Sequence, residues 1–304
     1  MATERSKCTV KLQMHRGRIA AGYIFLLIAS HVTERFQPSA RPLAGLRFAT
    51  VRTIDHGTME PRTIRLAYRD SAPVSTQTPV LLVHGSPGSG EVLQTLAGLL
   101  SPTFRVIVPD LPGFGSSTRD LPDYSFRAHG EYLIELMDAL HIPKAQLLGF
   151  SMGGGVALSM ADAAPQRVVS LVMLSAIGVQ EHELTGSYKV NHILHGTQLA
   201  VLWLLHNGLP HFGILSQLPF SMDYARNFYD SDQRPLRTVL AHYRGPMLII
   251  HGAKDRNVPL AAAVEHHRLV PQSELVVLDE NHFMAFMKPS LFLDPLVRFL
   301  SHEP

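Results

Sequence analysis

The chain has 304 residues, of which 46% are hydrophobic and 17% are charged. This composition is typical of a globular protein with a sizeable core, and it excludes an intrinsically disordered chain. The net charge is +2, but residues 1–47 alone carry +6, so the rest of the chain carries −4. A basic face for nucleic acid on the main part of the chain is therefore excluded, and no nucleic-acid partner is expected.

Residues 1–45 form a basic N-terminal tail around a short apolar segment. Arg16 and Arg18 precede an apolar run over residues 19–30, an order typical of a secretory signal or a membrane anchor. As a helix this run measures about 18 Å, less than a hydrocarbon core of about 30 Å. The pattern predicts export or membrane association through residues 16–32. The alternative is a cytoplasmic chain whose N-terminal helix packs on the fold or on a partner.

Short apolar segments then alternate with segments of helical spacing. Strands are predicted at residues 63–68, 80–83, 105–108, 146–150, 168–174, 247–250 and 275–278, and helices at 91–100, 126–140, 153–163, 260–269 and near 291–300. This alternation predicts a mostly parallel sheet with helices on both faces. A mostly helical insert interrupts it. We therefore expect an α/β core of residues 46–176 and 241–304, with a helical cap of residues 177–240.

Residues 149–153 read Gly-Phe-Ser-Met-Gly and fit the pattern G-x-S-x-G, between a predicted strand and a predicted helix. In that context a tight turn presents the serine hydroxyl at the helix N-terminus, where the helix dipole favours developing negative charge. The motif predicts Ser151 as a nucleophile.

Two further segments extend the pattern. Residues 84–87 read His-Gly-Ser-Pro after one predicted strand, and residues 110–115 read Asp-Leu-Pro-Gly-Phe-Gly after the next. With the Ser151 motif they resemble the α/β-hydrolase family, in its serine-nucleophile, esterase- or lipase-like branch with an H-G-x-P oxyanion loop. The resemblance covers about residues 60–176 and 245–300. It implies an α/β-hydrolase fold with a mostly parallel eight-stranded sheet flanked by helices and a helical cap after the sixth strand.

The resemblance also implies site residues. The backbone N–H groups of Ser86 and Met152 would form the oxyanion hole, while His84 would support the turn rather than act as a base. A serine nucleophile needs a base and an orienting acid, which follow it in the chain order Ser, Asp or Glu, His. Asp255 occupies the family's acid position, and His282, after the last predicted strand, occupies the base position. Asp279, three residues before His282, is the competing acid.

The cap contains many large apolar side chains, which line the substrate pocket in the family or else pack the cap on the core. They are Trp203, Leu204, Leu205, Phe212, Ile214, Leu215, Leu218, Phe220 and Met222. His192 and His195 have helical spacing, but two histidines are too few for a metal site, so no metal is expected. His266 and His267 are expected on a solvated helix face.

These features predict a carboxylic ester hydrolase that needs no cofactor and acts through an acyl-enzyme on Ser151. Its small-molecule substrate would have an apolar acyl or alcohol part. Related hydrolases of ring-cleavage diketones, which break a carbon–carbon bond, often share the Ser-Met-Gly-Gly sequence found at residues 151–154. Lactonase, thioesterase and acyltransferase activities also stay open, as does a ligand-binding protein on a hydrolase scaffold.

Overall fold

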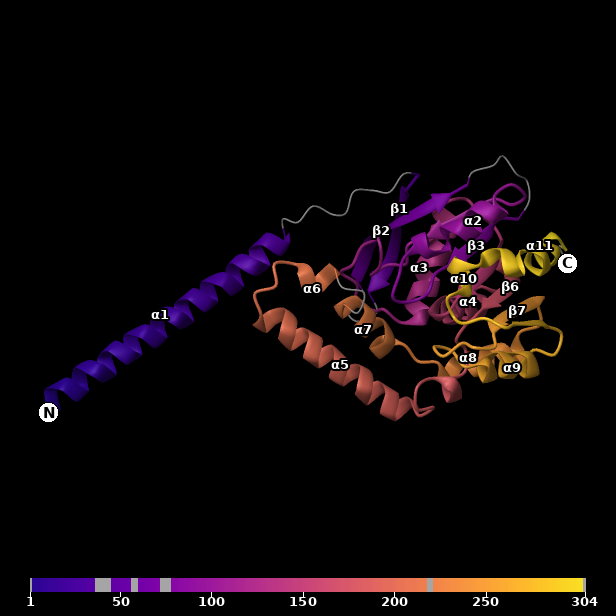
Figure 1. Ribbon diagram of the computed structural model, residues 1–304. Coiled ribbons are helices and arrows are strands. Elements are labelled where there is room, and N and C mark those ends of the chain that lie inside the picture. Colours follow the sequence, from indigo (N-terminus) through magenta and orange to yellow (C-terminus); the bar gives the residue numbers. More distant parts are fainter. Residues whose placement is uncertain (1, 36–44, 56–59, 72–77, 218–220, 303–304) are drawn as a thin grey trace.

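The computed structural model describes residues 2–35, 45–55, 60–71, 78–217 and 221–302. Eight strands form one sheet in the order β1-β2-β4-β3-β5-β6-β7-β8 (Figure 1). β1 and β2 pair antiparallel, β2 pairs antiparallel with β4, and all other neighbours are parallel. The strands are β1 (Arg47–Asp55), β2 (Glu60–Asp70), β3 (Val80–Val83), β4 (Val106–Pro109), β5 (Ala145–Phe150), β6 (Val168–Leu174), β7 (Met247–Gly252) and β8 (Glu274–Leu278).

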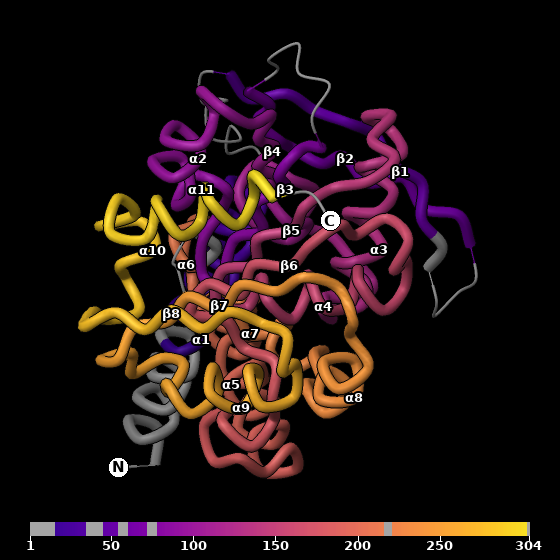
Figure 2. Tube along the Cα trace, turned by 90° about the vertical axis from the view of Figure 1, so that its right-hand side faces the viewer, coloured from indigo at the N-terminus to yellow at the C-terminus, as the bar shows by residue number. Residues whose placement is uncertain are grey.

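Helices cover both faces of this sheet. Figure 2 shows α2 and α10 on one side of the strands and α3 and α4 on the other. The core helices are α2 (Gln94–Leu100), α3 (Phe126–Ala139), α4 (Met152–Ala163), α9 (Leu260–Leu269), α10 (Met284–Met287) and α11 (Leu293–Ser301). This is the predicted α/β-hydrolase architecture, and the predicted fold class is confirmed.

The central strands are buried on both faces because their side chains alternate between two apolar layers. In β3, Leu81 and Val83 join the layer under α3 and α4, whereas Val80 and Leu82 join the layer under α2 and α11. All four side chains are at most 1% exposed. This double burial explains why the strands read as continuous apolar runs, and why their positions agree with the sequence prediction. β1 was not located from the sequence, because Arg47, Arg52 and Thr53 interrupt its apolar pattern.

The cap lies between β6 and β7. It comprises α5 (Tyr188–Gly208), α6 (Ile214–Gln217), α7 (Met222–Asp230) and α8 (Arg234–His242). α8 packs on the core, since its Leu236 and Leu240 belong to the same buried cluster as α3 and α4. The boundary between cap and core at residue 240 therefore stays a prediction. The last helix of the predicted cap, α8, packs against α3 and α4 of the core.

The N-terminal segment forms α1 (Ala2–Arg35), a single helix of 34 residues that projects from the body of the molecule (Figure 1). No helix in the described ranges combines the length and apolar character needed to cross a membrane. This finding corrects the prediction of export or membrane association through residues 16–32. The apolar run is bounded by Arg16 and Arg18 on one side and by Glu34 and Arg35 on the other, and the C-terminal end of α1 contacts the cap.

His129 and His266 are among the fully buried histidines of the core. His266 of α9 is 0% exposed, so its expected place on a solvated face is wrong; His267 is the partly exposed member of the pair. His129 of α3 is 0% exposed, and neither of its ring nitrogens has a hydrogen-bond partner among the described residues. Burial and, to a smaller extent, the nearby ring of His84 lower the pKa of His129 to about 3.

We predict that His129 makes stability depend on pH. Its pKa is about 3 in the folded chain and near 6.5 when unfolded, so between these values only the unfolded chain binds its proton. The free energy of unfolding should therefore fall as pH drops through this window, by about 1.4 kcal/mol per pH unit for one group. His129→Leu should have a shallower slope in urea titrations from pH 7 to pH 3. Exposed His242→Gln is the control, and equal slopes for all three proteins would contradict the prediction.

Candidate active site

Ser151 stands in the turn between β5 and α4. Its φ of 53° and ψ of −120° lie outside the favoured regions for a residue with a side chain, so the surrounding structure must hold it there. Its backbone N–H donates to the carbonyl of Leu174 at 3.1 Å, and its own carbonyl accepts from Gly154 at 3.0 Å and from Ile177 at 3.1 Å. The turn is thus tied to the end of β6 and to the start of the cap.

The two glycines of the motif are required by close backbone approach. A Cβ atom on Gly153 would lie 2.3 Å from the carbonyl oxygen of Val83, and one on Gly149 would lie 2.5 Å from the carbonyl oxygen of Gly153. Gly85 of the preceding loop is equally close, because its Cβ would lie 2.9 Å from the Cβ of Ser151. The glycines therefore let three backbone segments meet around the serine.

His282 and Asp255 form a direct hydrogen bond. His282 Nδ1 lies 2.7 Å from Oδ2 of Asp255, whose side chain is fully buried. Oδ1 of Asp255 accepts from the backbone N–H groups of Asn257 and Val258, each at 2.9 Å. Burial raises the pKa of Asp255, but the bonds from His282 and Val258 outweigh it and hold that pKa below its ordinary value. An ionised Asp255 places the proton of neutral His282 on Nδ1 and leaves Nε2 as an acceptor.

His251 supports this acid and was not identified from the sequence. Its Nε2 donates to the carbonyl of Val258 at 2.9 Å and lies 3.6 Å from Oδ2 of Asp255. Burial lowers the pKa of His251, so the ring is neutral and can make this bond with a proton on Nε2. The signal for it was the His-Gly pair at the end of the predicted strand, four residues before the acid.

Asp279, the competing acid, is directed elsewhere. Its Oδ2 accepts from Nζ of Lys254 at 2.7 Å, and its side chain is 81% exposed. The structure therefore brings Asp255, and not Asp279, to His282.

The loop after β3 lies on the other side of Ser151. Nδ1 of His84 donates to the carbonyl of Gly85 at 2.7 Å, and Nε2 accepts from the backbone N–H of Leu111 at 2.9 Å. His84 thus connects this loop to the loop after β4, as expected for a residue that supports the turn. Ser86 and Met152 both line the same pocket as Ser151, and their N–H roles stay predictions.

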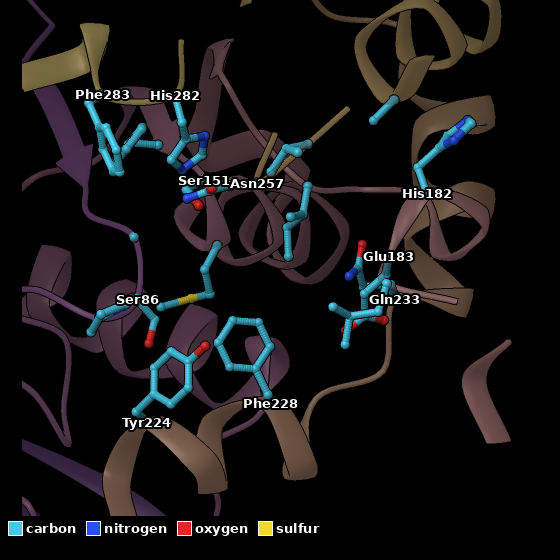
Figure 3. Close-up of a pocket in the computed structure, with 18 of the residues that line it drawn as sticks. Ser86, Ser151, His182, Glu183, Tyr224, Phe228, Gln233, Asn257, His282 and Phe283 are labelled. Atoms are coloured by element: carbon cyan, nitrogen blue, oxygen red, sulfur yellow. The ribbon is translucent and has the colours of Figure 1, made fainter. Parts of the chain in front are cut away.

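The pocket has a volume of about 520 Å³ and lies between the core loops and the cap. In Figure 3, Ser151 and His282 lie together on the core side, facing Tyr224 and Phe228 of α7 across the pocket. The lining is mainly apolar and includes Val92, Phe150, Ile177, Val179, Leu184, Phe228, Val258, Phe283 and Phe286. Such a lining suits an apolar substrate group.

The lining of this pocket contains one charged carboxylate and, among the described residues, no lysine or arginine. Glu183 lies with Gln233 at the end of the pocket away from His282 (Figure 3). Its Oε2 accepts from Gln180 at 2.6 Å, and its Oε1 lies 3.5 Å from Nε2 of His195. Glu183 is therefore the one acidic side chain in this described lining, which also contains His182, His195 and His282.

The structure places the described large apolar side chains of the expected cap lining away from the pocket at Ser151. None of Trp203, Leu204, Leu205, Phe212, Ile214, Leu215 and Met222 lines the pocket at Ser151, and Leu218 and Phe220 lie outside the described residues. Trp203 and Leu204 are 54% and 61% exposed and, with Met222, border a separate groove between α5 and α7. The sequence could not distinguish the two sides of α5, because both carry large apolar residues.

Comparison with known proteins agrees with this geometry. The family model described as alpha/beta hydrolase fold matches residues 78–193. The chain belongs to the α/β-hydrolase family. This membership supports hydrolase activity, and residues 78–193 include Ser151 and the loop of residues 84–87.

Three relatives illustrate the range of the family. A 2-hydroxymuconate semialdehyde hydrolase from Pseudomonas putida is 29% identical, over 73% of this chain and 87% of the relative. A meta-cleavage product hydrolase from Pseudomonas fluorescens is 25% identical with a TM-score of 0.61, over 78% of this chain and 94% of the relative. An esterase from Thermogutta terrifontis has the same fold, with 24% identity and a TM-score of 0.63 over 84% of this chain and 98% of the relative.

We predict that Gly153→Ala damages the turn at Ser151. The new Cβ would overlap the Val83 carbonyl, and such overpacking costs roughly 3 kcal/mol of unfolding free energy. Gly98→Ala is the matched control, because nothing lies within 4 Å of its added Cβ and the helix should gain up to about 1 kcal/mol. Chemical denaturation measures both changes, and an unaltered unfolding midpoint for Gly153→Ala would show that the close approach is absent.

Proposed function

We propose that the chain is a serine hydrolase that cleaves carboxylic esters with an apolar acyl or alcohol part. The observation that carries the proposal is the 2.7 Å bond between His282 and a buried Asp255, in a pocket that also holds Ser151. A base oriented by an ionised acid beside a strained serine is the arrangement that activates a hydroxyl for attack on a carbonyl.

In the proposed reaction, Nε2 of His282 takes the proton of Ser151 as its oxygen attacks the ester carbonyl carbon. The resulting oxyanion accepts hydrogen bonds from the backbone N–H groups of Ser86 and Met152, which can each contribute about 3 kcal/mol. His282 then gives its proton to the leaving alcohol. Water attacks the acyl group on Ser151 with His282 again as base, which releases the carboxylic acid and restores the enzyme.

The charge of the pocket favours a neutral substrate. Glu183 provides a carboxylate, and the described lining offers no lysine or arginine to bind a substrate carboxylate. Phe228 and Tyr224 instead provide aromatic surface opposite Ser151. A neutral ester with an apolar part fits these groups without an unpaired charge.

Carbon–carbon bond hydrolysis is the second candidate. It is favoured by the 29% identity to the 2-hydroxymuconate semialdehyde hydrolase and by the shared Ser-Met-Gly-Gly sequence at residues 151–154. The name of that relative's substrate denotes a carboxylate, and a carboxylate in this pocket would meet Glu183. We therefore place ester cleavage first and test the two reactions against each other.

Ser151→Ala should lower kcat for p-nitrophenyl esters by about 10⁴- to 10⁶-fold, since the acyl-enzyme cannot form. The wild-type protein should prefer medium-chain esters to palmitate, because the pocket at Ser151 has a volume of about 520 Å³, which is that of an ordinary small-ligand pocket. Ser159→Ala is the control, since Ser159 lies on the same helix and bonds only to the carbonyl of Gly155. Near-normal turnover by folded Ser151→Ala would exclude the mechanism.

Glu183→Gln should separate the two candidate reactions. Removing this carboxylate relieves repulsion of an anionic dienone substrate, so its kcat/KM should rise about tenfold, while that for p-nitrophenyl butyrate should change less than about twofold. Glu181→Gln is the matched control, because Glu181 pairs with Arg237 outside the pocket. If wild type cleaves the anionic dienone faster than any ester, the carbon–carbon reaction replaces the ester proposal.

A further inference from the structure

Four side chains converge where the C-terminal end of α1 contacts the cap. His31 and Glu34 come from α1, His206 comes from the last turn of α5, and His211 comes from the segment between α5 and α6. One ligand atom from each lies within 4.8 Å of those from the other three. We call these four residues the junction cluster. It is separate from the pocket at Ser151, none of whose lining residues belongs to it.

The carboxylate of Glu34 lies at the centre of the junction cluster. Its oxygens are 3.2 Å from Nε2 of His206, 3.7 Å from Nδ1 of His31 and 3.8 Å from Nε2 of His211. In a tetrahedral zinc site with metal–ligand bonds of about 2.0–2.1 Å, neighbouring ligand atoms are about 3.4 Å apart. These three contacts, which involve both oxygens of Glu34, differ from this spacing by a few tenths of an ångström, and all four ligand atoms lie within 4.8 Å of one another.

Backbone contacts hold the cluster together independently of its own side chains. Ser30 Oγ is buried and accepts from the backbone N–H groups of His211 at 2.8 Å and Phe212 at 2.6 Å. About two helical turns before Ser30, the hydroxyl of Tyr23 donates to the carbonyl of Gly208. α1 is thereby fixed to the cap at Gly208, which lies between His206 and His211, and at His211 itself.

His211 supplies a second observation. Its Nε2 is buried and has no hydrogen-bond partner among the described residues, although it points at the Glu34 carboxylate from 3.8 Å. Such an atom is costly to bury unless something binds it.

We propose that the junction cluster binds one divalent transition-metal cation of the zinc type, which fastens α1 to the cap. Three imidazoles and one carboxylate are ligands that Zn²⁺ accepts in tetrahedral sites. Glu34, surrounded by three histidines, supplies the negative charge that offsets part of the charge of the cation. Ordinary ion pairing of Glu34 would need only one protonated histidine and gives no reason for all three rings to converge.

Metal binding would change the position of the proton on the His211 ring. At present Nδ1 accepts from the backbone N–H of Gly213 at 3.1 Å. Metal on Nε2 requires the ring proton on Nδ1, so binding would break the bond that Gly213 donates. A metal-bound histidine ordinarily donates its other N–H to a backbone carbonyl, a carboxylate or a water molecule.

The only tryptophan of the chain gives a direct readout. Trp203 lies on α5, less than one turn before His206. Co²⁺ in the junction cluster should quench its fluorescence in a saturable way, and added Zn²⁺ should displace Co²⁺ and restore the signal. Calorimetry on the untagged, chelator-treated full chain should give one Zn²⁺ per chain with a Kd of about 1 μM or tighter.

Variants on α1 test the assignment. His31→Gln and Glu34→Gln should each weaken Zn²⁺ binding at least about tenfold and abolish saturable quenching, whereas exposed His242→Gln should match wild type. Circular dichroism and the metal-free unfolding midpoint should be the same for all four proteins. The proposal is overturned if wild type binds no Zn²⁺ at about 100 μM, or if the α1 variants bind as tightly as wild type.

Discussion

The structure around Ser151 depends on a close approach of backbones that only glycine permits. Gly153 lies against the carbonyl of Val83, and Gly85 lies against the side chain of Ser151. The ends of β3 and β5 and the start of α4 are therefore too close together for a Cβ atom at these two positions. This approach holds Ser151 in its strained conformation and puts the loop after β3 beside it. Ser151, this loop and the N-terminus of α4 therefore form one packed unit.

The acid and the base reach this unit through the parallel order of the sheet. Asp255 follows β7, His282 follows β8, and Ser151 follows β5, so all three stand at the carboxyl ends of parallel strands. His251 and the N–H groups of Asn257 and Val258 fix Asp255, which in turn fixes His282. The proposed chemistry therefore depends on the hydrogen bonds that orient Asp255 and His282 as well as on the three side chains themselves.

The cap forms part of the pocket at Ser151, and its attachment extends beyond the core. Its inner side brings Glu183 and Phe228 to the pocket, while its outer side contacts α1 through Ser30 and the junction cluster. α5 and the segment that follows it therefore connect the two regions. A cation at the junction would restrain this segment from outside while leaving the catalytic unit unaltered, which is why the two proposals are independent.

The sequence by itself determined the family, the central strands and the residues that come together at the site. Doubly buried strands are continuous apolar runs, and a serine turn needs glycine at fixed spacing, so both are local signals. Only the tertiary structure decided which side of α5 faces the pocket, that His251 supports Asp255, and that α1 ends against the cap. His31 and His206 are 175 positions apart in the sequence, and no local pattern records a contact between side chains that far apart.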